Sequence, residues 1–396
     1  MSVNNNMSNH MHQKVTRTHY LILIAVIVVA GSTQGMLLPV LAIFLDQMGV
    51  SEMMNGLNAA ALYIGSFAMM LVAEKVLGAL GFKKLIVGGL VLVLVTLLIF
   101  PWIPNIKLWF VLRLIIGIGD SALHYTSQLW VILSSPSQNR GRNLSIYGMS
   151  YGIGFSLGPL GISLLSYGKA VPFIILSFCI FIVLIFVLVK LPNMRPEKVV
   201  GVVNEKHRFR RSYRIAWYAL IPALLYGYME ASMNSSFPLY GLHIGFSEGQ
   251  ISALLPAIGI GGLLLQLPLG IMSDRYGRKR LLMCCGIAGG ITFSILPLAG
   301  DHFMLSIMLM MLAGGLVGSF FSLGLAYAAD VLPRDLLPAA NVVASFQFNI
   351  GSVVGPSLSG IFMFYHWEEG MFIMLGLSYL LFGLAGFWFS PPRQKS

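Results

Sequence analysis

The sequence predicts an all-α membrane protein with twelve transmembrane helices arranged as two pseudo-symmetric six-helix bundles. Low charge, long apolar runs and an internal duplication together support this fold class. Only 10% of the residues are charged and 57% are hydrophobic, whereas a soluble domain carries about 25% charged residues. A chain in lipid must pair its own backbone polar groups, which leaves helices or a closed barrel. The apolar runs do not alternate with polar residues as barrel strands do, so helices are predicted.

Each apolar run is close to the roughly 20 residues that a helix needs to cross a bilayer. The predicted spans are 20–45, 53–77, 84–104, 107–134, 144–168, 171–191, 215–243, 249–272, 280–300, 303–331, 337–365 and 368–390. They divide the chain into an N-terminal tail (1–18), a first bundle (19–191), a linker (192–214), a second bundle (215–390) and a C-terminal tail (391–396).

The distribution of lysine and arginine predicts how the spans are oriented. If both tails and the linker are cytoplasmic, all 25 of these residues fall on the inner side except Lys107, Lys169 and Arg113. Cytoplasmic loops carry an excess of these residues. The net charge of +11 is therefore explained by membrane topology and by attraction to anionic lipid. It does not indicate a nucleic-acid-binding protein.

The two halves of the chain repeat each other. Pro136 and Pro333 stand 197 residues apart, as do the prolines of "GPLG" and "GPSL" at Pro159 and Pro356. The stretch "GFKKL" at 81–85 corresponds to "GRKRL" at 277–281. A repeated unit of this length indicates a duplicated six-helix unit. Two such units related by an axis along the membrane normal form one transporter architecture, with its site at their interface.

The stretch "GIMSDRYGRKR" (270–280) resembles the signature turn of the major facilitator superfamily, G-x-x-x-D-R-x-G-R-K/R. The matching residues are Gly270, Asp274, Arg275, Gly277, Arg278 and Lys279. The resemblance implies a gating turn in which the aspartate faces a helix end and stabilises one conformation. The alternative is that these cations only fix the topology. The first half departs from the pattern, because Gly78 stands where the aspartate is expected.

Two further elements resemble family motifs. "GFSLGPLG" contains Gly154, Gly158, Pro159 and Gly161 and looks like the antiporter signature, although Ile162 replaces its final glycine. "RLIIGIG", from Arg113, looks like the family's R-x-x-x-G-x-G element, with Ile116 where glutamine is usual. The resemblance implies the drug:proton antiporter branch. The alternative for the first element is a packing seam of small residues.

Ionisable residues inside spans are rare and usually mark a transport pathway. Arg113, Asp120, His124 and Gln128 share one face of the fourth span, at spacings of 7, 4 and 4 residues. One hypothesis is a proton relay through Asp120, Arg113 and His124. The alternative is that Asp120 and His124 satisfy one another while Arg113 binds backbone carbonyls.

The seventh span carries Glu230 near mid-depth, followed by Asn234 and then Pro238. A polar cluster before a proline predicts a discontinuous helix that lines the cavity. Glu230 is a second candidate proton carrier, or a carboxylate that binds a cation. The full set of predicted substrate-binding residues is Gln34, Arg113, Gln128, Tyr151, Tyr226, Glu230, Asn234 and Gln347.

The preferred function is proton-coupled efflux of an amphipathic drug or small metabolite, by antiport with alternating access. The alternatives are a proton-coupled metabolite symporter and an exporter of an anionic metabolite anchored by Arg113; a lipid-moving protein or membrane enzyme is a more distant one. No Walker loop, zinc-protease motif or nucleophile elbow occurs, so no enzyme activity, cofactor or metal is expected. We expect a monomer in a bacterial inner membrane, with protons, a small molecule and lipids as its partners.

Overall fold

The first half of the chain folds into six membrane crossings. The computed structural model describes residues 17–134, 140–194, 208–333 and 336–390. Residues 1–16 of the predicted N-terminal tail, the predicted C-terminal tail and most of the predicted linker lie outside these residues. The N-terminal bundle consists of α1 (Arg17–Gln47), α2 (Glu52–Leu80), α3 (Phe82–Ile99), α4 (Ile106–Ser134), α5 (Arg140–Leu157) with a 3-10 continuation (Gly158–Tyr167), and α6 (Val171–Lys190).

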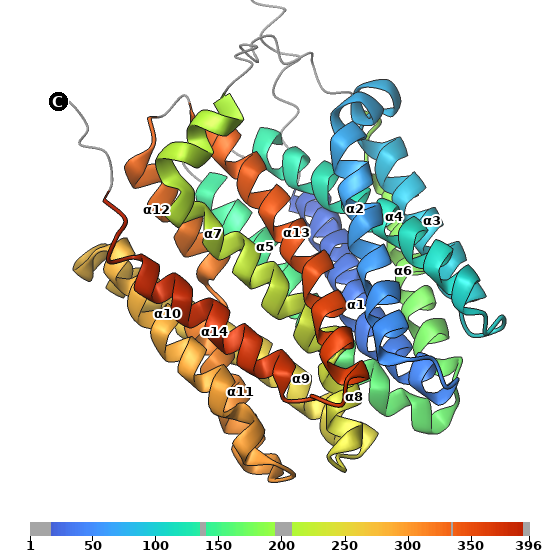
Figure 1. Cartoon of the computed structure of the whole chain (residues 1–396). Coiled ribbons are helices and arrows are strands. Elements are labelled where there is room, and N and C mark those ends of the chain that lie inside the picture. The colour runs from blue at the N-terminus through green and yellow to red at the C-terminus, as the bar shows by residue number, and fades with distance from the viewer. Residues whose placement is uncertain (1–16, 135–139, 195–207, 334–335, 391–396) are drawn as a thin grey trace, which may run out of the picture.

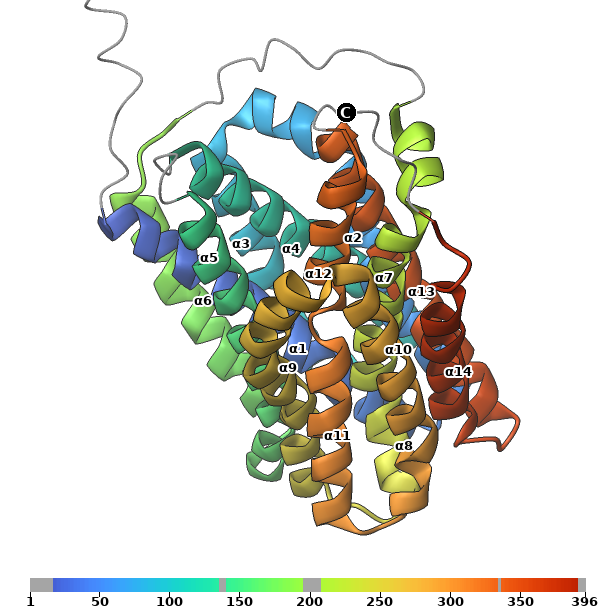
Figure 2. The ribbon, with the colours of Figure 1, turned by 90° about the vertical axis from the view of Figure 1, so that its left-hand side faces the viewer.

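The second half supplies another six crossings, several of them interrupted. They are formed by α7 (Arg208–Ser235) with α8 (Phe237–His243), α9 (Glu248–Tyr276), α10 (Arg278–Ile295) with a 3-10 turn (Leu296–Ala299), α11 (Phe303–Val317) with α12 (Phe320–Val331), α13 (Leu337–Phe364) and α14 (Gly370–Ala385). No strand is present in the described part of the chain. The N-terminal helices, blue to green, and the C-terminal helices, yellow to red, occupy opposite sides of the molecule (Figure 1; Figure 2).

Not every crossing is equally apolar. In the described residues, eight helical stretches are long and apolar enough to cross a bilayer by length and composition. The helices α4, α7 and α13 are outside this group and carry the buried Arg113, Glu230 and Gln347. The polar content that sets these helices apart is therefore buried within the protein, where polar side chains in a membrane protein are expected.

Both halves use the same close contacts between helices. A Cβ atom placed on Gly65 of α2 would lie 2.1 Å from the carbonyl oxygen of Leu114 in α4. The corresponding Gly261 of α9 would meet Met311 of α11 at 1.9 Å. Only glycine allows backbones to approach so closely. The positions differ by 196 residues (261 − 65), so the duplication seen in the sequence extends to the packing.

The signature turns are also equivalent in the two halves. Gly81 and Gly277 adopt φ values of 81° and 92°, a region that glycine enters without steric cost. Lys83 donates a hydrogen bond to the carbonyl oxygen of Leu188 at 2.8 Å. Lys279 donates to that of Phe389 at 2.6 Å. Each turn is thereby tied to the last crossing of its own bundle.

The two ends of the molecule differ in charge. We call the end with the α2–α3 and α9–α10 turns the basic end; its described cations are Arg17, Lys75, Lys83, Lys84, Lys190, Arg208, Arg210, Arg211, Arg214, Arg275, Arg278, Lys279 and Arg280. We call the other end the acidic end; it carries Asp46, Glu52, Glu248, Asp301, Glu368 and Glu369, together with Lys107 and Lys169.

The bundles touch each other at the acidic end and separate toward the basic end. Near the acidic end, a Cβ on Gly56 of α2 would meet the carbonyl oxygen of Pro356 in α13 at 2.1 Å, and one on Gly259 of α9 would meet Ser156 Oγ of α5 at 2.0 Å. Toward the basic end, Gly78 of α2 and Gly148 of α5 have no atom of the described residues within 4 Å of such a Cβ. The structure is thus closed at the acidic end.

The element that resembles the antiporter signature packs against α1. A Cβ on Gly154 would lie 2.2 Å from the carbonyl oxygen of Val28, and one on Gly158 would lie 2.4 Å from the carbonyl carbon of Gly35. The helix changes to 3-10 geometry at Gly158, next to Pro159. The carbonyl oxygen of Pro159 accepts a hydrogen bond from Ser252 of α9 at 3.1 Å. The element is therefore a packing seam that also reaches the second bundle.

We expect Gly154→Ala to lower the free energy of unfolding by about 1–3 kcal/mol, because the added methyl group overpacks the α1–α5 seam. The midpoint of thermal unfolding of the purified protein measures this. The matched control is Gly152→Ala, two residues away, where a Cβ has no atom within 4 Å. Equal midpoints for the two variants would show that the seam is not tightly packed.

We expect Gly56→Val to open the acidic end, because a side chain there separates α2 from α13. Overpacking of about 1–3 kcal/mol shifts a two-state equilibrium by roughly fivefold to more than a hundredfold. Distances between spin labels at positions 107 and 301, with the native cysteines replaced, measure the change. Gly78→Val, on the same helix but in open space, is the control. An unchanged distance distribution in Gly56→Val would contradict the expectation.

Candidate functional site

A cavity of about 190 Å³ lies between the two bundles. Its walls come from α5 and the start of its 3-10 continuation, from α7 and α9, and from Gly318. The lining residues are Gly148, Met149, Tyr151, Gly152, Phe155, Ser156, Pro159, Tyr226, Met229, Glu230, Asn234, Leu255, Ile258, Gly259, Gly262, Leu263, Gln266 and Gly318. Most of this surface is apolar, with a few hydroxyl and amide groups and one carboxylate. Ligand sites in proteins commonly have this composition.

The break between α7 and α8 brings Glu230 and Asn234 to the cavity. The helix ends at Ser235 and α8 starts at Phe237, with Pro238 in its first turn, where the expected discontinuity lies. Asn234 Nδ2 donates to the carbonyl oxygen of Glu230 at 2.8 Å. Glu230 Oε1 is buried and has no hydrogen-bond partner among the described residues. A buried acceptor without a partner is free to take a proton or a donor from a bound molecule.

Aromatic side chains from α4 and α5 stack beside the cavity. The rings of His124 and Tyr151 lie 5.2 Å apart and 7° from parallel. The hydroxyl of Tyr151 donates a hydrogen bond to Gln34 Oε1. Gln34 therefore lies behind the cavity wall, where it orients a lining residue.

His124 is paired with Tyr147 in the described structure. Its Nδ1 lies 2.8 Å from the Tyr147 hydroxyl, and that hydroxyl lies 3.0 Å from the carbonyl oxygen of His124. Asp120 Oδ1 is buried with no hydrogen-bond partner among the described residues. The alternative in which Asp120 and His124 satisfy one another is wrong for this conformation.

Arg113 is completely buried, with 0% of its surface exposed. None of its three guanidinium nitrogens makes a hydrogen bond within the described residues. The alternative in which Arg113 binds backbone carbonyls is therefore also wrong here. An uncompensated buried charge is destabilising by several kcal/mol, which is unusual for a residue with a structural role alone.

Tyr63 of α2 connects the charged groups, and the sequence analysis missed it. It interacts electrostatically with Arg113 and Asp120 of α4 and with Glu230 of α7, and it lies beside Gln34. Its hydroxyl is buried without a hydrogen-bond partner in the described chain. A single tyrosine in an apolar span gives no signal in the sequence; the close α2–α4 packing brings it near Arg113 and Asp120.

The structure separates the predicted substrate-binding residues into two groups. Tyr151, Tyr226, Glu230 and Asn234 line the cavity. Arg113, Gln128 and Gln347 are not among its lining residues; Gln347 is nonetheless buried, and its Oε1 has no partner among the described residues. The sequence analysis also missed Ser156 and Gln266, because a serine or glutamine in a span does not reveal which way it faces.

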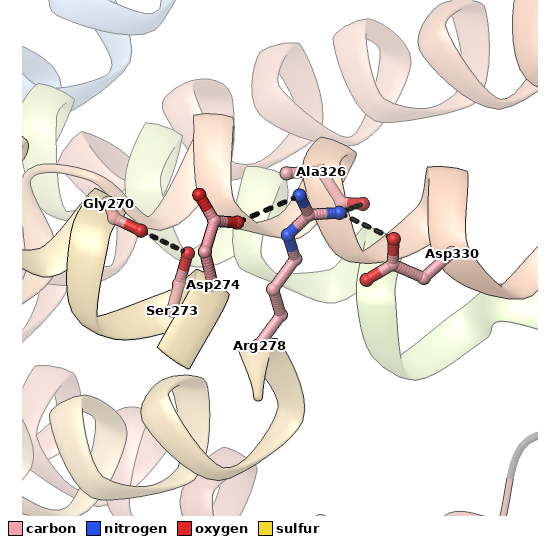
Figure 3. Close-up of polar contacts among 6 residues, drawn as sticks. All are labelled: Gly270, Ser273, Asp274, Arg278, Ala326 and Asp330. Atoms are coloured by element: carbon pink, nitrogen blue, oxygen red, sulfur yellow. Dashed lines mark hydrogen bonds and ion pairs between the residues drawn. The ribbon is translucent and has the colours of Figure 1, made fainter. Parts of the chain in front are cut away.

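The signature turn forms a charge cluster at the basic end (Figure 3). Arg278 contacts Asp274 Oδ1 at 3.1 Å and Asp330 Oδ1 at 2.5 Å. It also donates to the carbonyl oxygen of Ala326 at 2.7 Å. This cluster links α9, α10 and α12 within one bundle.

Asp274 is largely exposed in this conformation and is paired within its own bundle. Its side chain is 70% exposed and is paired with Arg278, four residues along the chain. The reason is geometric: toward the basic end the bundles are apart, and Gly270 of α9 has no atom within 4 Å of an added Cβ. Arg275 is likewise exposed.

Comparison with known proteins agrees with this architecture. The family model described as Major Facilitator Superfamily matches residues 23–262 and again 220–396. The uncharacterized MFS-type transporter YfkF of Bacillus subtilis is 40% identical over 352 residues, which are 88% of this chain and 90% of that protein. The uncharacterized MFS-type transporter YcaD of Salmonella dublin is 26% identical over 67% of this chain and 68% of its own.

Solved structures share the fold. The nucleoside transporter NupG superposes with a TM-score of 0.73 and 16% identity, covering 93% of this chain and 98% of its own. The D-xylose-proton symporter has a TM-score of 0.76 and 14% identity, covering 94% and 98%. The family match over both halves, the relative at 40% identity and the two packed bundles lead to one conclusion: this chain is an integral membrane protein of the major facilitator superfamily, a secondary transporter rather than an enzyme.

Proposed function

We propose that this transporter exports a small amphipathic cation or neutral amphipathic molecule in exchange for protons. The observation that carries the proposal is the Glu230 carboxylate, which lines the cavity with one oxygen unpaired among the described residues. Among the described residues, no lysine, arginine or histidine lines the cavity. A lone acid in an apolar pocket favours a ligand with an apolar body and a positive or hydrogen-donating group.

The proton and the solute would compete through Glu230 and Asp120. Both carboxylates are buried, and each has an oxygen without a hydrogen-bond partner among the described residues. Binding of a cation at Glu230 favours its ionised form and releases a proton; solute release allows the proton to return. Such competition couples two fluxes in opposite directions. It requires no cofactor or metal.

The orientation proposed from the sequence supports export. The positive-inside rule places the basic end in the cytoplasm, with both tails and the linker. The bundles are apart toward that end, so this conformation would load solute from the cytoplasm. The bacterial relatives support a bacterial inner membrane, and a cavity built wholly within one chain supports a functional monomer.

Proton symport of a polar solute is the second candidate. The amides of Asn234 and Gln266 and the hydroxyl of Ser156 line the same cavity and are suited to hydroxylated solutes. Proteins with the same fold include a nucleoside transporter and a D-xylose-proton symporter. The anionic-exporter alternative has less support, because Arg113 does not line the cavity.

The proposal is tested by a solute screen in proteoliposomes with an imposed pH gradient. For an antiporter, solute moves against the proton gradient, toward the acidic compartment; for a symporter, it accumulates with the protons. Organic cations, sugars and nucleosides are the three probe classes. Accumulation of sugars or nucleosides along the proton gradient, without movement of cations, would replace the export proposal with the symport one.

We expect Asp120→Asn to abolish solute movement driven by a pH gradient while preserving exchange of labelled for unlabelled solute. The reason is that exchange needs binding and access but no net proton transfer. Glu369→Gln, the same chemical change at an exposed carboxylate of the acidic end, is the matched control. Unchanged gradient-driven transport in Asp120→Asn would exclude Asp120 as a coupling residue.

We expect Glu230→Gln to weaken the binding of a cationic solute, and with it both gradient-driven transport and exchange, because the charge partner of the solute in the cavity is removed. A loss of about tenfold to a hundredfold in apparent affinity corresponds to the 1.5–3 kcal/mol of a hydrogen bond to a charged group. The concentration dependence of exchange measures it. Unaltered affinity for the cation would show that it binds elsewhere.

A further inference from the structure

A second hollow lies at the basic end, between the start of α7 and the residues that follow α14. This groove has a volume of about 600 Å³ and is lined by Arg211, Arg214, Ile215, Trp217, Trp388, Phe389 and Ser390. None of these residues takes part in the central cavity. The groove is therefore a separate feature of the molecule.

Phe389, at the base of the groove, is tightly packed. Phe389 is buried, with 4% exposure. Its ring packs edge-on against Trp217 at 5.5 Å and stacks on Tyr218 at 5.4 Å. Its carbonyl oxygen accepts the hydrogen bond from Lys279 at 2.6 Å. The chain after α14 is thus fixed against α7 and the signature turn.

The charge of the groove is positive. Arg211 and Arg214 are three residues apart on a helix, a spacing that places side chains on the same face. Lys279, whose ammonium group donates to the carbonyl oxygen of Phe389, adds a third cation nearby. In the part of the chain that the structure describes, no aspartate or glutamate lines the groove. The chemistry that fits is a phosphate ester: arginine binds phosphate oxygens in pairs through its planar fork.

The groove lies at the membrane–water interface of the basic end, which is the level of the lipid headgroups. The first turns of α7 bend away from the rest of the helix (Figure 1), with a non-helical φ of −121° at Ala216. A hydrogen bond holds the bent segment in place: Ser212 is buried, and its Oγ donates to the carbonyl oxygen of Leu336 at 3.4 Å. Trp388 is 80% exposed at the end of the last crossing. Exposed tryptophans at helix ends are typical of the membrane–water interface.

We propose that this groove binds the phosphate of an anionic phospholipid from the leaflet at the basic end. Arg211 and Arg214 hold the phosphate, and Trp217 and Trp388 form the interfacial walls along which the acyl chains leave toward the bilayer. The bound lipid bridges the start of α7 and the residues that follow α14, which line the groove together. This inference needs only the membrane location of the chain and is independent of the proposed antiport.

The test is native mass spectrometry of the purified, delipidated full chain with added phosphatidylglycerol or phosphatidylcholine. We expect phosphatidylglycerol to bind the wild type in preference to phosphatidylcholine. Each arginine removed by Arg211→Ala or Arg214→Ala should weaken that binding about fivefold, from roughly 1 kcal/mol per basic residue. The matched control is Arg210→Ala, which removes the same charge from the same segment but does not line the groove.

A second readout is the thermal midpoint, because a ligand that binds only the folded state raises it. Phosphatidylglycerol should raise the midpoint of wild type and Arg210→Ala more than that of the Arg211→Ala/Arg214→Ala double variant. Equal binding by the double variant and Arg210→Ala, or equal binding of the two lipids, would overturn the proposal. Full displacement of phosphatidylglycerol by millimolar inorganic phosphate would assign the groove to a free anion instead, which also overturns it.

Discussion

The close approach of helix backbones at glycine is the constraint on which the rest of this structure depends. Lipid gives no hydrophobic drive for helices to associate, so packing and hydrogen bonding must hold them. Gly65 and Gly117 let α2 and α4 meet backbone to backbone; an added Cβ on Gly117 would lie 1.9 Å from the carbonyl oxygen of Leu62. That contact places Tyr63 beside Arg113. The equivalent contact between α9 and α11 holds the second half together, and α9 forms one wall of the cavity.

The helix bundle buries ionisable side chains that keep atoms without a hydrogen-bond partner in the described structure. Arg113, Asp120 and Glu230 are all buried and carry atoms without hydrogen-bond partners in the described structure. Stability alone would favour apolar replacements for such groups. Their retention is understandable if protons and solute are the missing partners and if different partners bind in different conformations. Tyr63 is a neighbour that all three groups share.

The two halves are alike in packing and unlike in charge. Lys83 and Lys279 tie equivalent turns to the last crossing of each bundle. Only the second turn carries an aspartate, and it is bound with Arg278 and Asp330 in a cluster inside one bundle. Since Gly78 replaces that aspartate in the first half, the charge cluster of the α9–α10 turn has no equivalent carboxylate there. The groove beside Lys279 adds to this asymmetry at the basic end.

The sequence by itself determined the class, the crossings and the duplication. Low charge and continuous apolar runs leave a helical bundle as the solution in lipid, and the constant spacing between Pro159 and Pro356 is a property of the chain. It also identified Glu230, because an acid before a proline in an apolar span is exceptional. Only the tertiary structure decided which polar groups share a space. The sequence did not reveal Tyr63, Ser156 and Gln266, because helix rotation is set by packing against neighbours. It left open whether His124 takes part in a relay or pairs with Asp120, and only the structure places Tyr147, from another helix, beside it. The state of the bundles, closed at the acidic end, follows from contacts between residues some three hundred positions apart, such as Gly56 and Pro356, which no local pattern encodes.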